Sequence, residues 1–170
     1  MGIKKYQDRI IYQIYPKSFS DSNGDGIGDL RGIIGKLEYL KDLGVNTIWL
    51  NPIFVSPQID NGYDVSNYYA LDEKMGTLHD FDEFVETAHS LGLDVILDFV
   101  MNHTSDKHPW FKDAIANERS LYRDYYLWAK GKDGKLPNNW GSFFGGSVWD
   151  GLLAGGIAVL QRLGKGSASR

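Results

Sequence analysis

Cysteine is absent from the 170-residue chain, and this absence excludes disulfide bonds and thiolate metal sites. A long apolar run is also missing, because the stretch at residues 10–15 is too short for a signal sequence or a bilayer span. The chain has no excess of positive charge either: its formal net charge is −4, which argues against nucleic acid and anionic membranes as partners. These absences favour a cytoplasmic protein with neither a membrane nor a nucleic-acid partner.

Three short runs rich in β-branched and aromatic residues predict buried strands at residues 10–15, 47–50 and 95–99. Between these runs, apolar residues recur at three- and four-residue spacing, which predicts two amphipathic helices. The first helix carries Ile33, Ile34, Leu37 and Leu40 between the cap Asp29 and the stop Gly44, and the second carries Phe81, Phe84, Val85, Ala88 and Leu91 between Thr77 and Gly92.

Strands that alternate with helices and read as continuous apolar runs predict right-handed βαβ units, a parallel sheet and therefore the α/β fold class. A long polar and aromatic loop is expected from residue 51 to residue 76. After Asn102 the alternation stops, and a helix opened by Pro109 belongs to a region of short helices and aromatic loops. That region has the character of an insertion after the third strand.

Residues 21–29 form a segment in which oxygen-bearing side chains stand at alternate positions, with glycines that permit sharp turns. Such a segment, with a backbone carbonyl available at Ile27, can wrap a hard cation such as Ca²⁺. Gly32 stands where an EF-hand has its bidentate Glu, so the pattern favours a single calcium loop over an EF-hand. The alternative is a metal-free turn that caps the following helix.

Asp98, Asn102 and His103 follow or end the third predicted strand, and barrel enzymes place functional groups at the carboxyl ends of strands. His103 could donate to a sugar hydroxyl, and Asp98 could hold neighbouring groups in position. Taken by itself, His103 is better explained as a buried structural residue, but its neighbours favour a functional role. The other histidines, His79, His89 and His108, are expected to be solvated or to cap helices.

The loop after the second predicted strand contains Asp60 and Tyr63 within residues 57–64. Tyr63 offers a flat face to a pyranose ring and Asp60 offers an acceptor for hydroxyl pairs, a mixture expected in a ligand cleft. Alone, the Asn61-Gly62 pair would indicate only a turn. Four later aromatic residues either line the mouth of a cleft or form an ordinary hydrophobic cluster: Trp140, Phe143, Phe144 and Trp149.

Three segments taken in order closely resemble glycoside hydrolase family 13, the α-amylase superfamily, and within it the oligo-1,6-glucosidase and α-glucosidase branch. The segments read IIYQIYPKSFSDSNGDGIGDL, IDNGYDVSNY and DVILDFVMNHTS, and the resemblance extends over residues 6–149. It implies an incomplete (β/α)8 TIM barrel. Residues 1–103 would be the N-terminal part of the catalytic barrel, residues 104–150 the start of an inserted domain B, and residues 151–170 a divergent tail.

The resemblance also implies a function, namely retaining hydrolysis of α-glucosidic bonds in oligosaccharides, with α-1,6 bonds such as that of isomaltose as the expected target. Asp60, Tyr63 and His103 would contact the glucosyl unit, while Asp98 and Asn102 would be structural supports. A structural Ca²⁺ would be held by Asp21, Asn23, Asp25, the Ile27 carbonyl and Asp29. The family takes its nucleophile and its acid/base from later strands, so we expect this chain to be inactive alone.

Several alternatives stay open at this point. Within the family, transglycosylation, sucrose isomerisation and phosphotrehalose cleavage are all compatible with these segments. From other classes, the chain could be a noncatalytic sugar-binding or calcium-binding module, an assembly subunit, or a misassembled gene fragment without an independent role.

Overall fold

The computed structural model describes residues 6–131, 133–142, 145–150 and 157–160. The chain divides into two compact units, each of which is described by itself. The first unit comprises Met1–Val55 and Tyr68–Phe99, and the second comprises Ser56–Asn67 and Val100–Arg170. The segment expected to be barrel, residues 1–103, therefore contributes to both units. Every helix among the described residues is too short or too polar to traverse a lipid bilayer.

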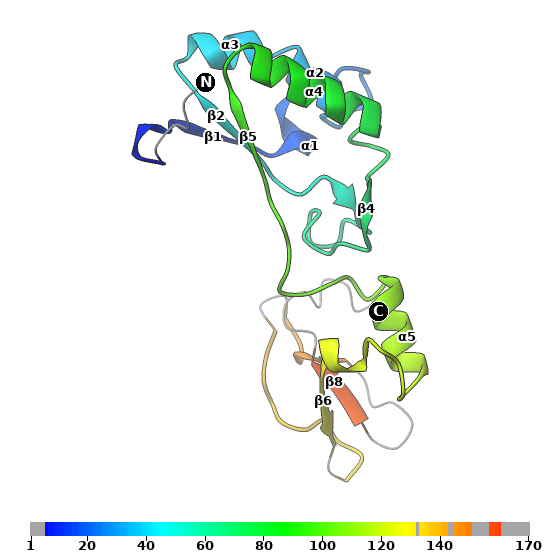
Figure 1. Cartoon of the computed structure of the whole chain (residues 1–170). Coiled ribbons are helices and arrows are strands. Elements are labelled where there is room, and N and C mark those ends of the chain that lie inside the picture. The colour runs from blue at the N-terminus through cyan, green and yellow to red at the C-terminus, as the bar shows by residue number, and fades with distance from the viewer. Residues whose placement is uncertain (1–5, 132, 143–144, 151–156, 161–170) are drawn as a thin grey trace. The chain divides into compact units, whose positions relative to one another are not determined.

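Three parallel strands form the sheet of the first unit (Figure 1). They are β1 (Ile11–Ile14), β2 (Thr47–Leu50) and β5 (Asp94–Leu97), in the order β1-β2-β5. Tyr12, Ile48 and Val95 stand in register across the three strands. The predicted parallel sheet is confirmed by this pairing. A helical crossover separates each apolar run from the next, and such a connection lets consecutive strands run parallel.

The helices of the first unit are α1 (Pro16–Phe19), α2 (Leu30–Ile34), α3 (Leu37–Asp42) and α4 (Leu78–Ser90), after the 3-10 turn η1 (Tyr6–Asp8). The prediction of one continuous helix through residues 33–40 is wrong, because the chain leaves helical geometry at Lys36, where φ is −114° and ψ is 2°. Gly35 before it has low helix propensity, which makes the break easier. The predicted cap is confirmed: the Gly32 N–H donates to the Asp29 side chain.

Helix α4 begins as the sequence predicts. The Thr77 side chain accepts the Asp80 N–H at 3.2 Å, and the Asp80 carboxylate accepts the Thr77 N–H at 2.7 Å, which completes a capping box. The other Asp80 oxygen pairs with Arg31 of α2 at 2.7 Å, so the same carboxylate joins two helices. Its hydrogen bonds with Thr77, and secondarily the charge of Arg31, lower the pKa of Asp80.

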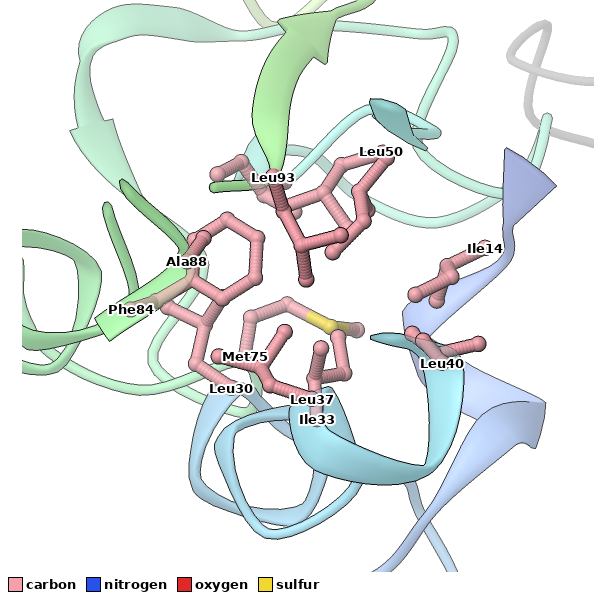
Figure 2. Close-up of a cluster of buried hydrophobic side chains, with 12 residues drawn as sticks. Ile14, Leu30, Ile33, Leu37, Leu40, Leu50, Met75, Phe84, Ala88 and Leu93 are labelled. Atoms are coloured by element: carbon pink, nitrogen blue, oxygen red, sulfur yellow. The ribbon is translucent and has the colours of Figure 1, made fainter. Parts of the chain in front are cut away.

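The core of the first unit lies between the sheet and helices α2, α3 and α4. Figure 2 shows Ile14 of β1 beside Leu40 of α3, in one cluster with Leu50 of β2 and Phe84 of α4. The cluster of buried side chains consists of Ile14, Leu30, Ile33, Leu37, Leu40, Ile48, Leu50, Ile53, Met75, Phe84, Ala88 and Leu93. Alternation along each strand explains it, since every second side chain faces the helices. The predicted apolar periodicity is thus the periodicity of this core.

Two further strands lie inside the segment predicted as a continuous loop. They are β3 (Phe54–Val55) and β4 (Asn67–Leu71), which pair with each other. The prediction of an uninterrupted loop from residue 51 to residue 76 is therefore wrong. A two-residue strand carries no readable alternation, and its partner begins twelve residues later, so only the folded chain reveals the pairing.

The second unit contains α5 (Pro109–Ala116), the 3-10 turn η2 (Arg123–Tyr125) and an antiparallel sheet. The sheet consists of β6 (Leu127–Lys130), β7 (Trp149–Asp150) and β8 (Ile157–Leu160), in the order β6-β8-β7. Helix α5 opens at Pro109 as predicted. Strand β8 belongs to the segment expected to be a divergent tail, whose residues 151–156 and 161–170 lie outside the described part, as do Phe143 and Phe144.

Candidate functional site

A buried carboxylate organises the loop that contains Asp60 and Tyr63. Asp64 is only 3% exposed, and it accepts hydrogen bonds from the Ser56 hydroxyl at 2.6 Å, the Ile59 N–H at 3.0 Å and the Asp60 N–H at 3.1 Å. All three donors come from residues four to eight positions earlier in the chain. The carboxylate therefore closes residues 56–64 into a compact loop with Asp60 near its tip.

The tip of this loop uses left-handed backbone geometry. Asn61 has a φ of 51° and Gly62 a φ of 100°, and the Tyr63 N–H donates to the Asp60 carbonyl at 3.0 Å. Asn tolerates left-handed geometry, and Gly62 adopts it without a steric penalty. The Asn61-Gly62 pair is therefore a turn, as its residues alone indicate. This turn brings the backbone of Tyr63 back to the Asp60 carbonyl.

His103 binds the same loop from the other segment of the second unit. Its Nε2 lies 3.0 Å from the Tyr63 carbonyl oxygen, and its Nδ1 lies 3.4 Å from the Asn102 amide nitrogen. Because a carbonyl can only accept, Nε2 donates the hydrogen bond to Tyr63. Two residues further along both segments, the Ser105 N–H donates to the Val65 carbonyl at 2.9 Å. These paired bonds hold the two segments together at His103.

The pKa of Asp60 depends on its burial and on two neighbouring side chains. Its partial burial raises the pKa of the Asp60 carboxyl, the negative charge of Asp64 raises it further, and His103 opposes both effects. Asp60, Asp64 and His103 therefore form one electrostatic group, next to the half-buried Tyr63. Such a group can accept hydrogen bonds from hydroxyls beside an aromatic face.

Asp98 belongs to the first unit, where it follows β5 directly. Its carboxylate accepts a hydrogen bond from the Trp49 indole N–H at 2.9 Å, so it supports a side chain of the neighbouring strand β2. The backbone N–H of Asp98 donates to Leu50 at 3.1 Å and extends the sheet by one residue. A supporting role toward the sugar-binding residues stays a prediction for both Asp98 and Asn102.

The segment predicted as a calcium loop folds on hydrogen bonds from its own backbone. Asp21 accepts from the N–H groups of Asn23, Gly24 and Gly26, and these bonds lower the pKa of Asp21, with those from Gly26 and Gly24 foremost. Asn23 and Asp25 each accept from the N–H two residues later. These bonds are compatible with both alternatives, the calcium loop and the metal-free turn, and Asp29 supplies the cap of the following helix.

The same loop offers oxygen donors that fit a hard cation. The side chains of Asp21, Asn23 and Asp25 are exposed, and each is an oxygen donor of the kind that Ca²⁺ prefers. Asp29 is already engaged, since its two oxygens accept from Ser22 and Gly32. In the part of the chain that the structure describes, no three His, Cys, Asp or Glu side chains gather as a metal site. The fit therefore rests on a mixed set of Asp, Asn and carbonyl oxygens.

Sequence reasoning missed two residues that shape the site, Asp64 and Tyr126. Asp64 stood beside Tyr63 in the predicted motif, but its burial comes only from the folded loop. The Tyr126 hydroxyl lies 2.9 Å from the hydroxyl of Thr104, the residue that follows His103 in the chain. His108, expected to be solvated or capping, is buried and caps α5 by accepting the Trp110 N–H at 3.1 Å. The capping alternative is thus correct for His108.

Known proteins resemble this chain over most of its length. A family model described as the catalytic domain of α-amylase matches residues 13–153. The oligo-1,6-glucosidase of Parageobacillus thermoglucosidasius is 52% identical over 145 residues, which are 85% of this chain and 26% of that protein. The trehalose-6-phosphate hydrolase of Escherichia coli is 58% identical over 144 residues, with the same two shares of 85% and 26%.

Solved structures agree with these sequence matches. The crystal structure of Bacillus licheniformis trehalose-6-phosphate hydrolase has a TM-score of 0.87 to this chain at 50% identity, covering 94% of this chain and 29% of that one. The chain thus spans 26% of the length of each of the two curated relatives described above. The parallel strands and their helices are part of a (β/α)8 barrel, which confirms the predicted fold class. The chain belongs to the α-amylase catalytic-domain family, glycoside hydrolase family 13.

Proposed function

We propose that this chain forms part of the glucosyl-binding subsite of a retaining α-glucosidase that hydrolyses short oligosaccharides, with the α-1,6 bond of isomaltose as its target. The observation that carries the proposal is the hydrogen bond of His103 to the Tyr63 carbonyl, which sets an imidazole beside the loop of Asp60. The name of the P. thermoglucosidasius relative supports the choice of substrate.

The three residues have complementary roles in this proposal. The Tyr63 ring supplies an apolar face for the pyranose, and the Asp60 carboxylate accepts hydrogen bonds from sugar hydroxyls. His103 uses its Nε2–H on the loop, so its imidazole keeps Tyr63 in place and contributes a polar edge. Partial burial of Asp60 strengthens any hydrogen bond that its carboxylate accepts, because water competes less there.

Cleavage with retention needs two carboxyl groups about 5–5.5 Å apart, one as nucleophile and one as acid/base. In this loop the two carboxylates are Asp60 and Asp64, and Asp64 is buried and bound by three donors. A nucleophile must reach the sugar, so Asp64 cannot serve as one. We therefore propose that the 170-residue chain recognises a glucosyl unit without cleaving the bond.

Binding and turnover test the proposal separately. The 170-residue chain is titrated with methyl α-glucoside, and glucose release from isomaltose is followed in parallel. We expect binding that weakens about tenfold or more in Asp60→Asn, the loss expected for a hydrogen bond to a charged group, and no glucose release. Asp82→Asn, an exposed acid of α4, is the matched control and should bind as the original chain does. Binding that is indifferent to Asp60→Asn would contradict the proposal.

A second candidate substrate is trehalose 6-phosphate. It is favoured by the 58% identity to the E. coli trehalose-6-phosphate hydrolase, which exceeds the 52% identity to the P. thermoglucosidasius oligo-1,6-glucosidase. Two chimeras distinguish the candidates, each with residues 13–153 of this chain in place of the matched segment of one relative. Each is assayed for glucose release from isomaltose and from trehalose 6-phosphate. Activity retained by only one host identifies the substrate with which this segment is compatible.

We also propose that residues 21–29 bind a structural Ca²⁺ through Asp21, Asn23, Asp25 and the Ile27 carbonyl, with Asp29 completing the set. Calcium that binds only the folded chain must raise its thermal stability. We expect a higher Tm in millimolar calcium, reversed by a chelator and lost in Asp21→Asn. Asp42→Asn in α3 removes the same charge outside the loop and should keep the response. A Tm unchanged by calcium would exclude the calcium loop and leave the metal-free turn.

A further inference from the structure

The loop of the candidate site depends on one carboxylate that does not face the sugar. All three hydrogen bonds of Asp64 go to its own loop: Oδ1 accepts from Ser56 and Asp60, and Oδ2 accepts from Ile59. At 3% exposure, this side chain has no open face left for a ligand. Asp64 therefore acts inside the loop, and whatever it does for a sugar it does through its neighbours.

The Ser56 hydroxyl extends the influence of Asp64 by one residue. It donates to Asp64 Oδ1 at 2.6 Å and accepts the Gln58 N–H at 2.9 Å. The hydroxyl is therefore a relay that connects the Asp64 carboxylate to the backbone in the middle of the loop. Gln58 has a φ of 62°, a left-handed geometry that a non-glycine residue adopts at a steric cost. Such a geometry persists only where surrounding bonds enforce it, and the Ser56 and Asp64 bonds lie on both sides of Gln58.

We propose that Asp64 is the positioning residue of the glucosyl subsite: its carboxylate folds residues 56–64 so that Asp60 and Tyr63 stand against His103. This inference rests on the proposed function and names a residue on which the subsite depends. The direct bond from the Asp60 N–H to Asp64 sets the backbone of Asp60. The Tyr63 N–H then bonds back to the Asp60 carbonyl, and the Tyr63 carbonyl receives His103. One chain of hydrogen bonds thus leads from Asp64 to all three sugar-contacting residues.

The charge of Asp64 has a second consequence for Asp60. Because like charges repel, Asp64 adds to the rise in the pKa of Asp60 that burial begins, while His103 counteracts it. A neutral group in place of Asp64 would therefore lower the pKa of Asp60. A residue that served only as structural filler would leave that pKa where it is, so the titration of Asp60 separates the two roles.

The test uses the 170-residue chain and three variants, with amide and carboxyl NMR signals and a methyl α-glucoside titration as readouts. Asp64→Asn keeps the shape and the Oδ1 acceptor but puts an amide donor opposite the Ile59 N–H. We expect displaced Ile59 and Asp60 amide signals, a lower Asp60 pKa, and affinity reduced about tenfold. Ser56→Ala removes only the relay, so affinity should fall while the Asp60 pKa stays. Asp72→Asn, another buried acid, should change none of these readouts.

The outcomes separate this inference from the proposed function. Unchanged Ile59 and Asp60 signals in Asp64→Asn, together with an unchanged Asp60 pKa, would overturn the positioning role. If Asp64→Asn fails to fold, Ser56→Ala decides: affinity equal to that of the original chain would overturn it. If the original chain binds no glucoside while both variants shift the loop signals as expected, the loop architecture is supported and the glucosyl subsite is refuted.

Discussion

The two units of this chain are stabilised in different ways. The first unit has a continuous apolar core in which all twelve clustered side chains come from its strands, its helices or the segments beside them. Both units bury polar side chains, such as Asp80 in the first and Asp64 and His108 in the second, but the twelve-residue apolar cluster lies in the first. An apolar core follows from sequence periodicity, whereas the partners of a buried polar side chain follow from individual hydrogen bonds. The candidate sugar-binding residues lie in the second unit, beside the buried carboxylate of Asp64.

Several aromatic contacts join α5 to the residues that follow it in the second unit. The Trp110 ring stacks on Tyr122 with centroids 5.6 Å apart, and His108 lies 4.5 Å from Trp110. The Arg123 guanidinium lies 3.2 Å from the centroid of Trp128, a cation–π contact. These contacts depend on ring orientation, so they tolerate substitution less evenly than aliphatic packing does.

The largest expected effect is a loss of folding stability in the first unit. Phe84 is fully buried in the apolar core, so Phe84→Ala should lower the free energy of unfolding by about 3–5 kcal/mol. Urea titration followed by far-UV circular dichroism measures the change. Tyr39→Ala, at an exposed position of α3, is the control and should stay within about 0.5 kcal/mol of the original chain. Equal losses in both variants would show that the core is not assembled as described.

A smaller effect tests the hydrogen bonds of the second unit. Tyr126→Phe removes the hydroxyl that meets Thr104 but keeps the ring that packs at 5.0 Å against Phe111. We expect a loss of about 0.5–1.5 kcal/mol in the free energy of unfolding, the usual value of one hydrogen bond. Tyr125→Phe, where the side chain is 63% exposed, should cost less. Urea titration measures both variants. The reverse ranking would contradict a stabilising hydrogen bond between Tyr126 and Thr104.

The smallest expected effect is a pH dependence that belongs to the second unit. Burial lowers the pKa of His108, so the unfolded chain binds a proton at a higher pH than the folded one. The contribution of His108 is complete above its unfolded pKa of about 6.5 and is lost as the pH falls from there toward the lower folded pKa. Protonation would also remove the acceptor that caps α5.

Substitution of His108 isolates that dependence. His108→Asn keeps a capping acceptor but does not titrate, so urea midpoints between about pH 7.5 and 5.5 should fall less than in the original chain. The first unit should not respond in this range. Its Asp80 has a lowered pKa, so its contribution is present above the unfolded value of about 3.9 and is lost only in stronger acid. Parallel midpoints in both chains would refute the role of His108.

The sequence by itself determined the strand–helix alternation, the parallel sheet and the caps at Asp29 and Thr77. These features depend on neighbours within a few residues and on the period of apolar side chains, which are visible without a fold. The family motifs also named Asp60, Tyr63 and His103 in advance. Of these, the structure brings Tyr63 and His103 into direct contact, and Asp60 responds electrostatically to His103.

Only the tertiary structure decided which residues hold the site together. The sequence does not show that Asp64 is buried, because its burial and its hydrogen-bond partners come from the closed loop. The same is true of the break between α2 and α3 and of the pairing of β3 with β4. Local preference at those positions is weak, so the contacts that long-range packing permits determine the outcome.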